Sequence, residues 1–223
     1  MLKARKRISK RQMKQDKLVT YYFKTVDYLQ NQSRNLIWTL GAILIVILAI
    51  FIFSRKQAEK EQKAITALTE ARAEYAGNNF EAAEGKLQNL INSYGGTKSG
   101  QIATFYLANS KFHLQKYEAA EKLFRKYIDE GEDEILRASA YSGVAACLEE
   151  QGKFHEAAEM YQTAAKKSQD EFMTPKNLYD SARCYSLAGN KEAAREALQT
   201  LINEYSQSQI KNDAETLLAQ LSY

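Results

Sequence analysis

The sequence predicts an all-α protein, with a single N-terminal transmembrane helix followed by a solenoid of helical hairpins. Three observations predict this fold class. Ala, Glu, Lys, Gln and Leu dominate the composition, and there is only one Pro, as is typical of helices. One uncharged, apolar stretch is long enough to cross a bilayer. A short motif recurs four times, as "NFEAAEGKL", "KYEAAEKLF", "KFHEAAEMY" and "NKEAAREAL".

The net charge of +4 is unevenly distributed along the chain. Residues 1–35 carry ten Lys or Arg and two Asp, residues 36–53 carry no charge, and residues 54–223 carry 21 basic and 25 acidic side chains. The chain therefore has a basic head, a neutral stretch and a mildly acidic body. The basic residues are confined to one end, so the overall positive charge does not by itself predict nucleic-acid binding.

The neutral stretch, "LIWTLGAILIVILAIFIF", is interpreted as a permanent transmembrane helix over residues 36–53. As a helix it is about 27 Å long, close to the roughly 30 Å hydrocarbon core of a bilayer. A buried core helix is disfavoured because the stretch is apolar on every face. A cleaved signal peptide is disfavoured because residues 54–57, "SRKQ", contain no small-x-small cleavage site. The predicted anchor residues are Leu36, Trp38 and Phe53.

The distribution of Lys and Arg predicts the orientation of this helix. Ten basic residues precede it, and only four follow closely. The positive-inside rule then places the N-terminus in the cytoplasm and the C-terminal body outside. In a bacterium with two membranes, this is a single-pass protein of the inner membrane with a periplasmic domain. Residues 54–63 are expected to form a helical linker.

The basic head, residues 1–35, is expected to lie at the inner leaflet. "DKLVTYYFKTVDYL" places Leu18, Tyr22, Val26 and Leu29 at helical spacing, which predicts an amphipathic interfacial helix. The preceding charge run is expected to contact anionic lipid, at about 1 kcal/mol per charge. Nucleic acid is a less favoured partner because no aromatic residue is interleaved in that run for stacking. The lipid-facing residues are Lys3, Arg5, Lys6, Arg7, Lys10 and Arg11.

Four sets of residues recur every 37 positions in the body. Two sets are alanines, one set is large and apolar, and one set marks a turn. They are Ala71, Ala108, Ala145 and Ala182; Ala83, Ala120, Ala157 and Ala194; Leu87, Phe124, Tyr161 and Leu198; and Asn78, Gln115, Gly152 and Gly189. Each unit is predicted to be helix, turn, helix, with alanines where two backbones approach closely. About four 37-residue repeats span residues 64–209.

A capping helix is predicted over residues 210–223, because Ala219 continues the first alanine series where no second helix follows. Thr174 is predicted to cap the first helix of the fourth unit, with Pro175 at its first position.

The pattern resembles the tetratricopeptide repeat, with an aromatic residue after the turn at Phe80, Tyr117 and Phe154. It departs from that family in its period, 37 residues rather than 34, and in lacking a proline that closes each unit. The resemblance implies that the first helix of each unit lines a groove that binds polypeptides. The alternative is that several of these residues only pack against neighbours. The groove residues implied by the resemblance are Arg72, Tyr75, Phe105, Asn109, Phe112, Tyr179 and Arg183.

No catalytic or metal-binding pattern is found. His113 and His155 have no second ligand at metal spacing. Cys147 and Cys184 occupy equivalent positions in consecutive units, where helices pack too far apart for a disulfide, and are predicted to be buried thiols. We therefore expect no enzyme activity, no cofactor, no metal and no small-molecule substrate.

The whole layout is similar to the ancillary subunit of the bacterial Sec translocon. This resemblance implies a membrane-anchored scaffold whose partners are translocon components, exported polypeptides or periplasmic chaperones. One alternative is a structural scaffold in cell-envelope assembly or cell division. Another is an adaptor that binds ribosomes or nucleic acid through its basic tail.

Overall fold

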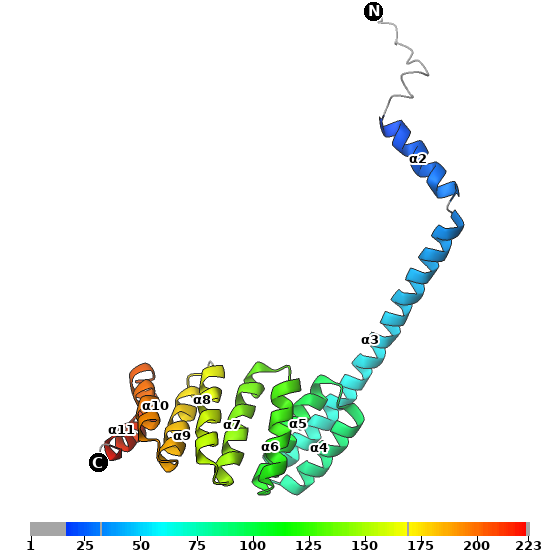
Figure 1. Ribbon diagram of the computed structural model, residues 1–223. Coiled ribbons are helices and arrows are strands. Elements are labelled where there is room, and N and C mark those ends of the chain that lie inside the picture. The colour runs from blue at the N-terminus through cyan, green and yellow to red at the C-terminus, as the bar shows by residue number, and fades with distance from the viewer. Residues whose placement is uncertain (1–16, 32, 169, 222–223) are drawn as a thin grey trace, which may run out of the picture. The chain divides into compact units, whose positions relative to one another are not determined.

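The computed structural model describes residues 17–31, 33–168 and 170–221, and this part of the chain forms ten helices and no strand (Figure 1). The all-α prediction is therefore confirmed for these residues. The chain divides into two compact units, Met1–Lys56 and Gln57–Tyr223.

The first compact unit contains α2 (Lys17–Asn31) and the beginning of α3 (Ser33–Ala76). From Ile37 onward α3 is long and apolar enough to be a candidate membrane span, and none of its most apolar window is buried. The large apolar side chains from Ile37 to Phe53, including Trp38, are each 51–73% exposed. Leu36 lies in the same helix. The predicted lipid-facing residues Lys3, Arg5, Lys6, Arg7, Lys10 and Arg11 lie outside the described residues.

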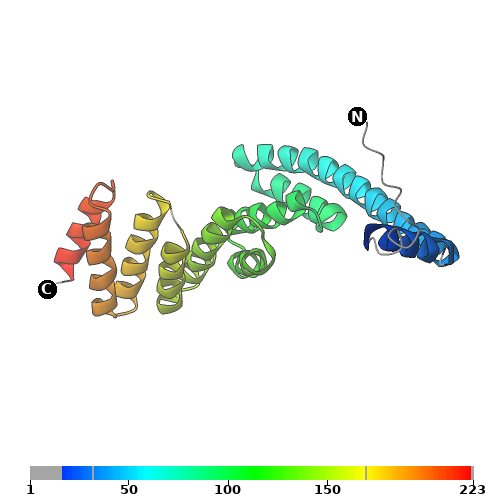
Figure 2. The ribbon, with the colours of Figure 1, turned by 90° about the horizontal axis from the view of Figure 1, so that it is seen from above.

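The second compact unit is a row of four helical hairpins and a capping helix. Consecutive helices follow one another side by side, as both views show (Figures 1 and 2). Hairpin 1 pairs the end of α3 with α4 (Phe80–Tyr94), and hairpin 2 pairs α5 (Lys98–His113) with α6 (Tyr117–Glu130). Hairpin 3 pairs α7 (Glu134–Glu150) with α8 (Phe154–Lys167), and hairpin 4 pairs α9 (Met173–Leu187) with α10 (Lys191–Glu204). The capping helix is α11 (Lys211–Gln220).

The same backbone turn closes all four hairpins. The predicted turn residues all have positive φ: Asn78 at 60°, Gln115 at 59°, Gly152 at 75° and Gly189 at 80°. In each turn the following amide donates to the carbonyl five residues earlier, as from Asn79 to Glu74 at 2.9 Å. This is the Schellman closure of a helix C-terminus. Two of the four turns adopt it without glycine, which is the residue that the left-handed region favours.

The core is built on the residues that the 37-residue interval singles out. All eight alanines of the two series are fully buried, and the four large residues that accompany them are buried as well. Gly143 marks a close approach of two helices, because a Cβ at this position would lie 2.6 Å from the ring of Phe124. Small residues thus let the helices come together, and the large residues fill the space beside them.

A carboxylate from α3 fixes the start of hairpin 2. Glu61 accepts hydrogen bonds from the amides of Lys98 at 2.9 Å and Ser99 at 3.2 Å, and from Ser99 Oγ at 2.6 Å. A negative charge at a helix N-terminus is favourable because it meets unpaired amides and the positive end of the helix dipole. The end of α3 is therefore tied to α5 by more than apolar packing.

The predicted start of α9 is wrong, and Ala219 does not take the buried position that its alanine series has in the hairpins. Ala219 is exposed, whereas Ala214 is fully buried. In the other hairpins, the second helix covers the first-helix alanine. No second helix follows α11 among the described residues, so only the side of α11 that contacts α10 is buried. Helix α9 begins at Met173, and Asp170 Oδ1, rather than Thr174, accepts the amides of Phe172 at 2.7 Å and Met173 at 2.9 Å. A carboxylate three residues before the first helical residue can bind both amides, so the chain enters the helix earlier.

Candidate functional site

The exposed faces of α3, α5, α7 and α9 form a surface, which we call the first-helix surface. It begins at residue 57 and lies within the second compact unit. Of the seven predicted groove residues, Arg72 is exposed and the other six are partly exposed. None of the seven is fully buried. They differ in the neighbouring residues that each side chain contacts.

On hairpins 1 and 2, aromatic side chains cover the first-helix surface. The Arg72 guanidinium lies 5.0 Å from the centre of the Tyr106 ring, a cation–π contact. The Tyr75 ring packs against Tyr106 and Phe80, both at 5.5 Å between centroids, and its Oη lies 3.4 Å from His113 Nε2. An open hollow of about 390 Å³ is lined by six residues, among them Arg72, Tyr75 and Tyr106.

The three predicted groove residues of hairpin 2 pack against or hydrogen-bond to neighbouring residues. Phe105 packs edge-on against Phe124 and lies 5.6 Å from Tyr127 between centroids. Phe112 packs against Tyr117 at 5.4 Å. Asn109 Nδ2 donates to the Phe105 carbonyl at 2.9 Å. This part of the surface is therefore well filled by its own side chains.

Arg183 joins hairpins 3 and 4. Its guanidinium pairs with both carboxylate oxygens of Glu149, with Nη2 to Oε2 at 2.8 Å and a second contact from Nη1 to Oε1. Glu149 also accepts from Tyr161 Oη at 3.3 Å and from Cys184 Sγ at 3.5 Å. Burial opposes ionisation of Glu149, but the hydrogen bonds and charge of Arg183 outweigh it and lower the pKa of this carboxyl. One carboxylate thus connects α7, α8 and α9.

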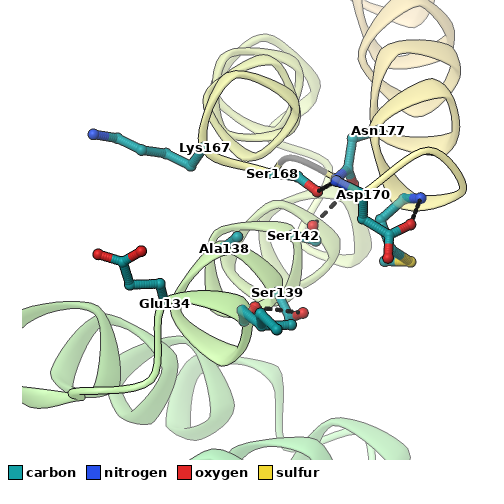
Figure 3. Close-up of a pocket in the computed structure, with 10 residues that line it drawn as sticks. Glu134, Ala138, Ser139, Ser142, Lys167, Ser168, Asp170 and Asn177 are labelled. Carbon is teal, nitrogen blue, oxygen red and sulfur yellow. Dashed lines mark hydrogen bonds between the residues drawn. The ribbon is translucent and has the colours of Figure 1, made fainter.

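A cavity of about 310 Å³ opens between α7 and α9, and we call it the α7–α9 cavity (Figure 3). Ser142 lines it at the position that Phe105 holds in hairpin 2 and Tyr179 in hairpin 4, each 37 residues away. A serine in place of an aromatic ring leaves this space open. The lining residues are Glu134, Ile135, Ala138, Ser139, Ser142, Lys167, Ser168, Asp170, Met173 and Asn177.

Asn177 gives the α7–α9 cavity a polar wall. It is 3% exposed, and its Oδ1 accepts from Ser142 Oγ at 2.8 Å, as the dashed line in Figure 3 marks. Its Nδ2 has no hydrogen-bond partner among the described residues. Of the four equivalent positions at intervals of 37 residues, three hold Ala103, Ala140 and Ala214, all fully buried, and Thr66 occupies the fourth. Packing between helices therefore does not require an amide at this position.

Two exposed apolar residues, Ile135 and Met173, line the α7–α9 cavity, and a third, Phe172, precedes Met173 in the chain. Ile135 is 76% exposed, Phe172 is 78% exposed and Met173 is 38% exposed. Among the described residues of the second compact unit, the other large apolar residues that are exposed are Ile65 and Leu187. A cluster of this kind is typical of an interaction site rather than of an ordinary surface.

Two carboxylates flank these apolar residues. The side chain of Glu134 is 88% exposed. Hydrogen bonds from the amides of Met173 and Phe172 lower the pKa of Asp170, so this carboxyl is ionised at neutral pH. Lys167 also lines the cavity, and its side chain extends on the same side of the view as that of Glu134 (Figure 3).

Sequence reasoning selected no groove residue from the third unit. The 37-residue interval leads from Phe105 to Ser142 directly, and Asn177 is the one amide in a series whose other members are Thr66 and three alanines. Both signals were present in the sequence. Ile135 and Met173 had no such signal, because their exposure depends on how the connections before α7 and α9 run.

Comparison with known proteins settles the family. A family model described as a tetratricopeptide repeat-like domain matches residues 27–209. The chain belongs to this family. The matched range includes the apolar part of α3 as well as the four hairpins.

Solved structures support the same fold. Two crystal structures of TPR-like repeats from a putative kinesin light chain of Podosopora anserina, one of them carrying a single substitution, are similar to this chain. Each is 14% identical with a TM-score of 0.59, and the alignments cover 72% of this chain and 86% and 85% of those chains. At this identity the likeness concerns the fold alone. No curated protein matches the sequence.

Tetratricopeptide repeat folds are in general non-catalytic scaffolds for protein–protein interaction, and this repeat domain is of that class. The described residues contain no group of three or more His, Cys, Asp or Glu that could hold a metal ion. Cys147 and Cys184 are free and buried, as predicted.

Proposed function

We propose that this protein is a membrane-anchored, protein-binding scaffold that acts as an ancillary subunit of the Sec translocon. In this role its repeats bind exported polypeptides as they leave the channel and link them to periplasmic chaperones. The observation that carries the proposal is the continuity of α3, a single 44-residue helix that contains both the apolar stretch and the first helix of hairpin 1. The family match also takes in both parts.

The exposed apolar side chains support the membrane anchor. From Ile37 to Phe53 every large apolar side chain is more than half exposed, on all sides of the helix. Leaving such a surface in water costs about 25 cal/mol per Å² of apolar area. A bilayer core covers it without a partner protein, and the flanking Arg34, Arg55 and Lys56 can reach the head groups at either end.

Helix α2 supports a location of the head at the membrane surface. Tyr21, Tyr22 and Tyr28 are each more than 60% exposed on this short helix, which also carries Lys24. Tyrosine prefers the boundary between lipid and water because its ring is apolar and its hydroxyl is polar. Together with the excess of Lys and Arg before the span, this supports a head on the cytoplasmic side and repeats in the periplasm.

Tethering explains how a weak binding surface would serve this function. A scaffold fixed beside a channel meets each emerging chain at an effective concentration of about millimolar, so modest affinity suffices. The first-helix surface offers aromatic, cationic and apolar groups for such contacts, including Arg72 and the α7–α9 cavity.

Topology can be tested with single introduced cysteines. Burial raises the pKa of Cys147 and of Cys184 to about 12, so the native thiols should not react with maleimide. In spheroplasts, a membrane-impermeant maleimide should label Gln199→Cys on α10 without lysis, and Ser9→Cys only after lysis. The reverse pattern would contradict the proposed orientation.

The partner can be identified by photocrosslinking in intact membranes. A photoreactive residue in place of Arg72 or Tyr179, on the first-helix surface, should capture translocon components or nascent secretory chains. The same residue in place of Gln199, on a second helix, should capture them far less. Capture of outer-membrane or cell-wall assembly proteins instead would favour a scaffold in envelope assembly or cell division.

A further inference from the structure

We propose that the α7–α9 cavity binds one large apolar side chain of an extended polypeptide that carries Lys or Arg beside that side chain. This inference rests on the proposed function, since it assumes that the repeats bind unfolded chain, and it names the sequence feature that they select.

The size of the cavity suits a single side chain with its adjacent backbone. About 310 Å³ lies at the lower end of the range for small-ligand pockets. Ser142 stands where the neighbouring hairpins place Phe105 and Tyr179. The space therefore corresponds to a ring that this repeat lacks, and an apolar side chain from a partner can take its place.

The exposed apolar residues at the mouth favour the entry of an apolar side chain. Ile135 and Met173 line the opening, and Phe172 is next to it in the chain. A partner that covers them removes apolar surface from water on both molecules, which is favourable in proportion to the area covered.

Asn177 supplies the contact to the backbone of the partner. Its amide group is almost fully buried, and its Nδ2 donates to no described residue. Nδ2 is therefore free to donate to an acceptor that a ligand brings. An extended polypeptide has unpaired backbone carbonyls on either side of each residue.

The charges at the opening select the residues beside the apolar side chain. Glu134 and Asp170 line the cavity together with Lys167, and Glu134 also lies 3.6 Å from the guanidinium of Arg137. Five of the six residues from Asp129 to Glu134 are acidic. A Lys or Arg next to the inserted side chain meets these carboxylates, whereas Asp or Glu there would be repelled.

Binding of three labelled peptides to the full-length protein in detergent micelles tests the inference by fluorescence anisotropy. The peptides share the frame Gly-Ser-Lys-X-Lys-Ser-Gly with X as Leu or Ala, and the third has Leu between two Glu. We expect the Leu peptide to bind about tenfold more tightly than the Ala peptide, because its larger side chain is buried. The peptide with Glu should bind at least tenfold more weakly than its Lys counterpart.

Two variants separate the parts of the site. Ser142→Phe places in the cavity the ring that hairpin 2 already has at this position, so the fold should persist and the preference for Leu should disappear. Asn177→Ala installs the residue found at three of the four equivalent positions, and should weaken both Lys peptides several-fold while keeping the preference for Leu. Leu187→Ala removes an exposed apolar side chain that does not line the cavity and should change nothing. Circular dichroism of each variant checks that it is folded.

Equal binding of the Leu and Ala peptides to the native protein would overturn the inference, as would a preference for Leu that survives in folded Ser142→Phe. Photocrosslinking from Arg72 distinguishes this failure from failure of the proposed function. If that site still captures exported polypeptides, the scaffold stands and only the cavity assignment fails. If it captures none, the proposed function itself fails.

Discussion

Hairpins 2 and 3 share one backbone plan but differ in how their first helices are filled. At two adjacent positions, α5 has Phe105 and Tyr106, and 37 residues later α7 has Ser142 and Gly143. The rings of α5 cover the surface. The small residues of α7 allow a closer approach to Phe124 and leave a cavity toward α9. The repeat period therefore sets the path of the chain, and a few side chains decide where a partner can enter.

The turns show a second difference between the two halves. Hairpins 1 and 2 close through Asn78 and Gln115, and hairpins 3 and 4 through Gly152 and Gly189, all in the left-handed region. A residue with a side chain costs about 1–2 kcal/mol in this conformation, and glycine costs more to order on folding. The turns of hairpins 1 and 2 therefore carry backbone strain, whereas those of hairpins 3 and 4 carry a larger entropy cost on folding.

The largest expected effect on stability comes from removing a ring from the packed surface of hairpin 2. Phe105→Ala should lower the free energy of unfolding by about 2–3 kcal/mol, since the ring packs against Phe124 and Tyr127. Ser142→Ala, at the equivalent position, should cost about 1 kcal/mol for its hydrogen bond to Asn177. Urea unfolding of the full chain in micelles, followed by circular dichroism, measures both. Similar costs would mean that the two positions do not differ as described.

Adding a single methyl group to α7 where it packs against Phe124 should have the next largest effect on stability. Gly143→Ala places a Cβ about 2.6 Å from the Phe124 ring, so the ring or the helix must move, at about 1–3 kcal/mol. The same unfolding measurement detects it. Ser139→Ala, on the cavity side of α7, is the matched control and should cost less than about 1 kcal/mol.

Breaking the contact between hairpins 3 and 4 should give a pH-dependent loss. Arg183→Ala should cost about 2 kcal/mol at pH 7, because it leaves the partly buried Glu149 ionised without its partner. The pKa of Glu149 is lowered in the folded state. Its stabilising contribution is therefore present above its unfolded pKa of about 4.3 and is lost as pH falls through the lower folded pKa.

The measurement that checks this is the difference in unfolding free energy between the native protein and Arg183→Ala, at pH 7 and near pH 3. The difference should shrink at the lower pH. An exposed arginine in an i,i+4 pair on α6, Arg125, provides the control, since Arg125→Ala should cost under about 1 kcal/mol at pH 7. A difference for Arg183→Ala that is unchanged by pH would contradict the role given to Glu149.

Exchanging the turn residues should give the smallest effect. Gln115→Gly should stabilise the protein by about 0.5 kcal/mol, because relief of left-handed strain slightly exceeds the added chain entropy. Gly152→Gln should destabilise it by about 1 kcal/mol. Thermal unfolding of both variants gives the signs. Effects of the same sign would show that the two turns are not equivalent.

The fold was largely predictable because it depends on small residues at a fixed interval. Ala83 and Ala120 could be recognised as crossing positions, and Asn78 and Gln115 as turns, from spacing alone. Spacing carried no information about helix ends, where Asp170 binds the first amides of α9 in place of the predicted Thr174.

The site was less predictable because the contacts between repeats, rather than the period, determine which side chains remain free. Arg183 was selected by position, yet its guanidinium is bound to Glu149. The α7–α9 cavity results from a small residue at Ser142, which was not among the predicted groove residues. Asn177 is conspicuous only when compared with Ala103 and Ala140, its equivalents in hairpins 2 and 3.

Amide hydrogen exchange of the full chain in micelles, with and without a saturating unfolded secretory protein, tests the central claim most directly. The account predicts slower exchange at the start of α7, in the connection between α8 and α9 and in the first turns of α9, with α5 unchanged. Slower exchange confined to α3 and α5, or no change at saturation, would contradict it.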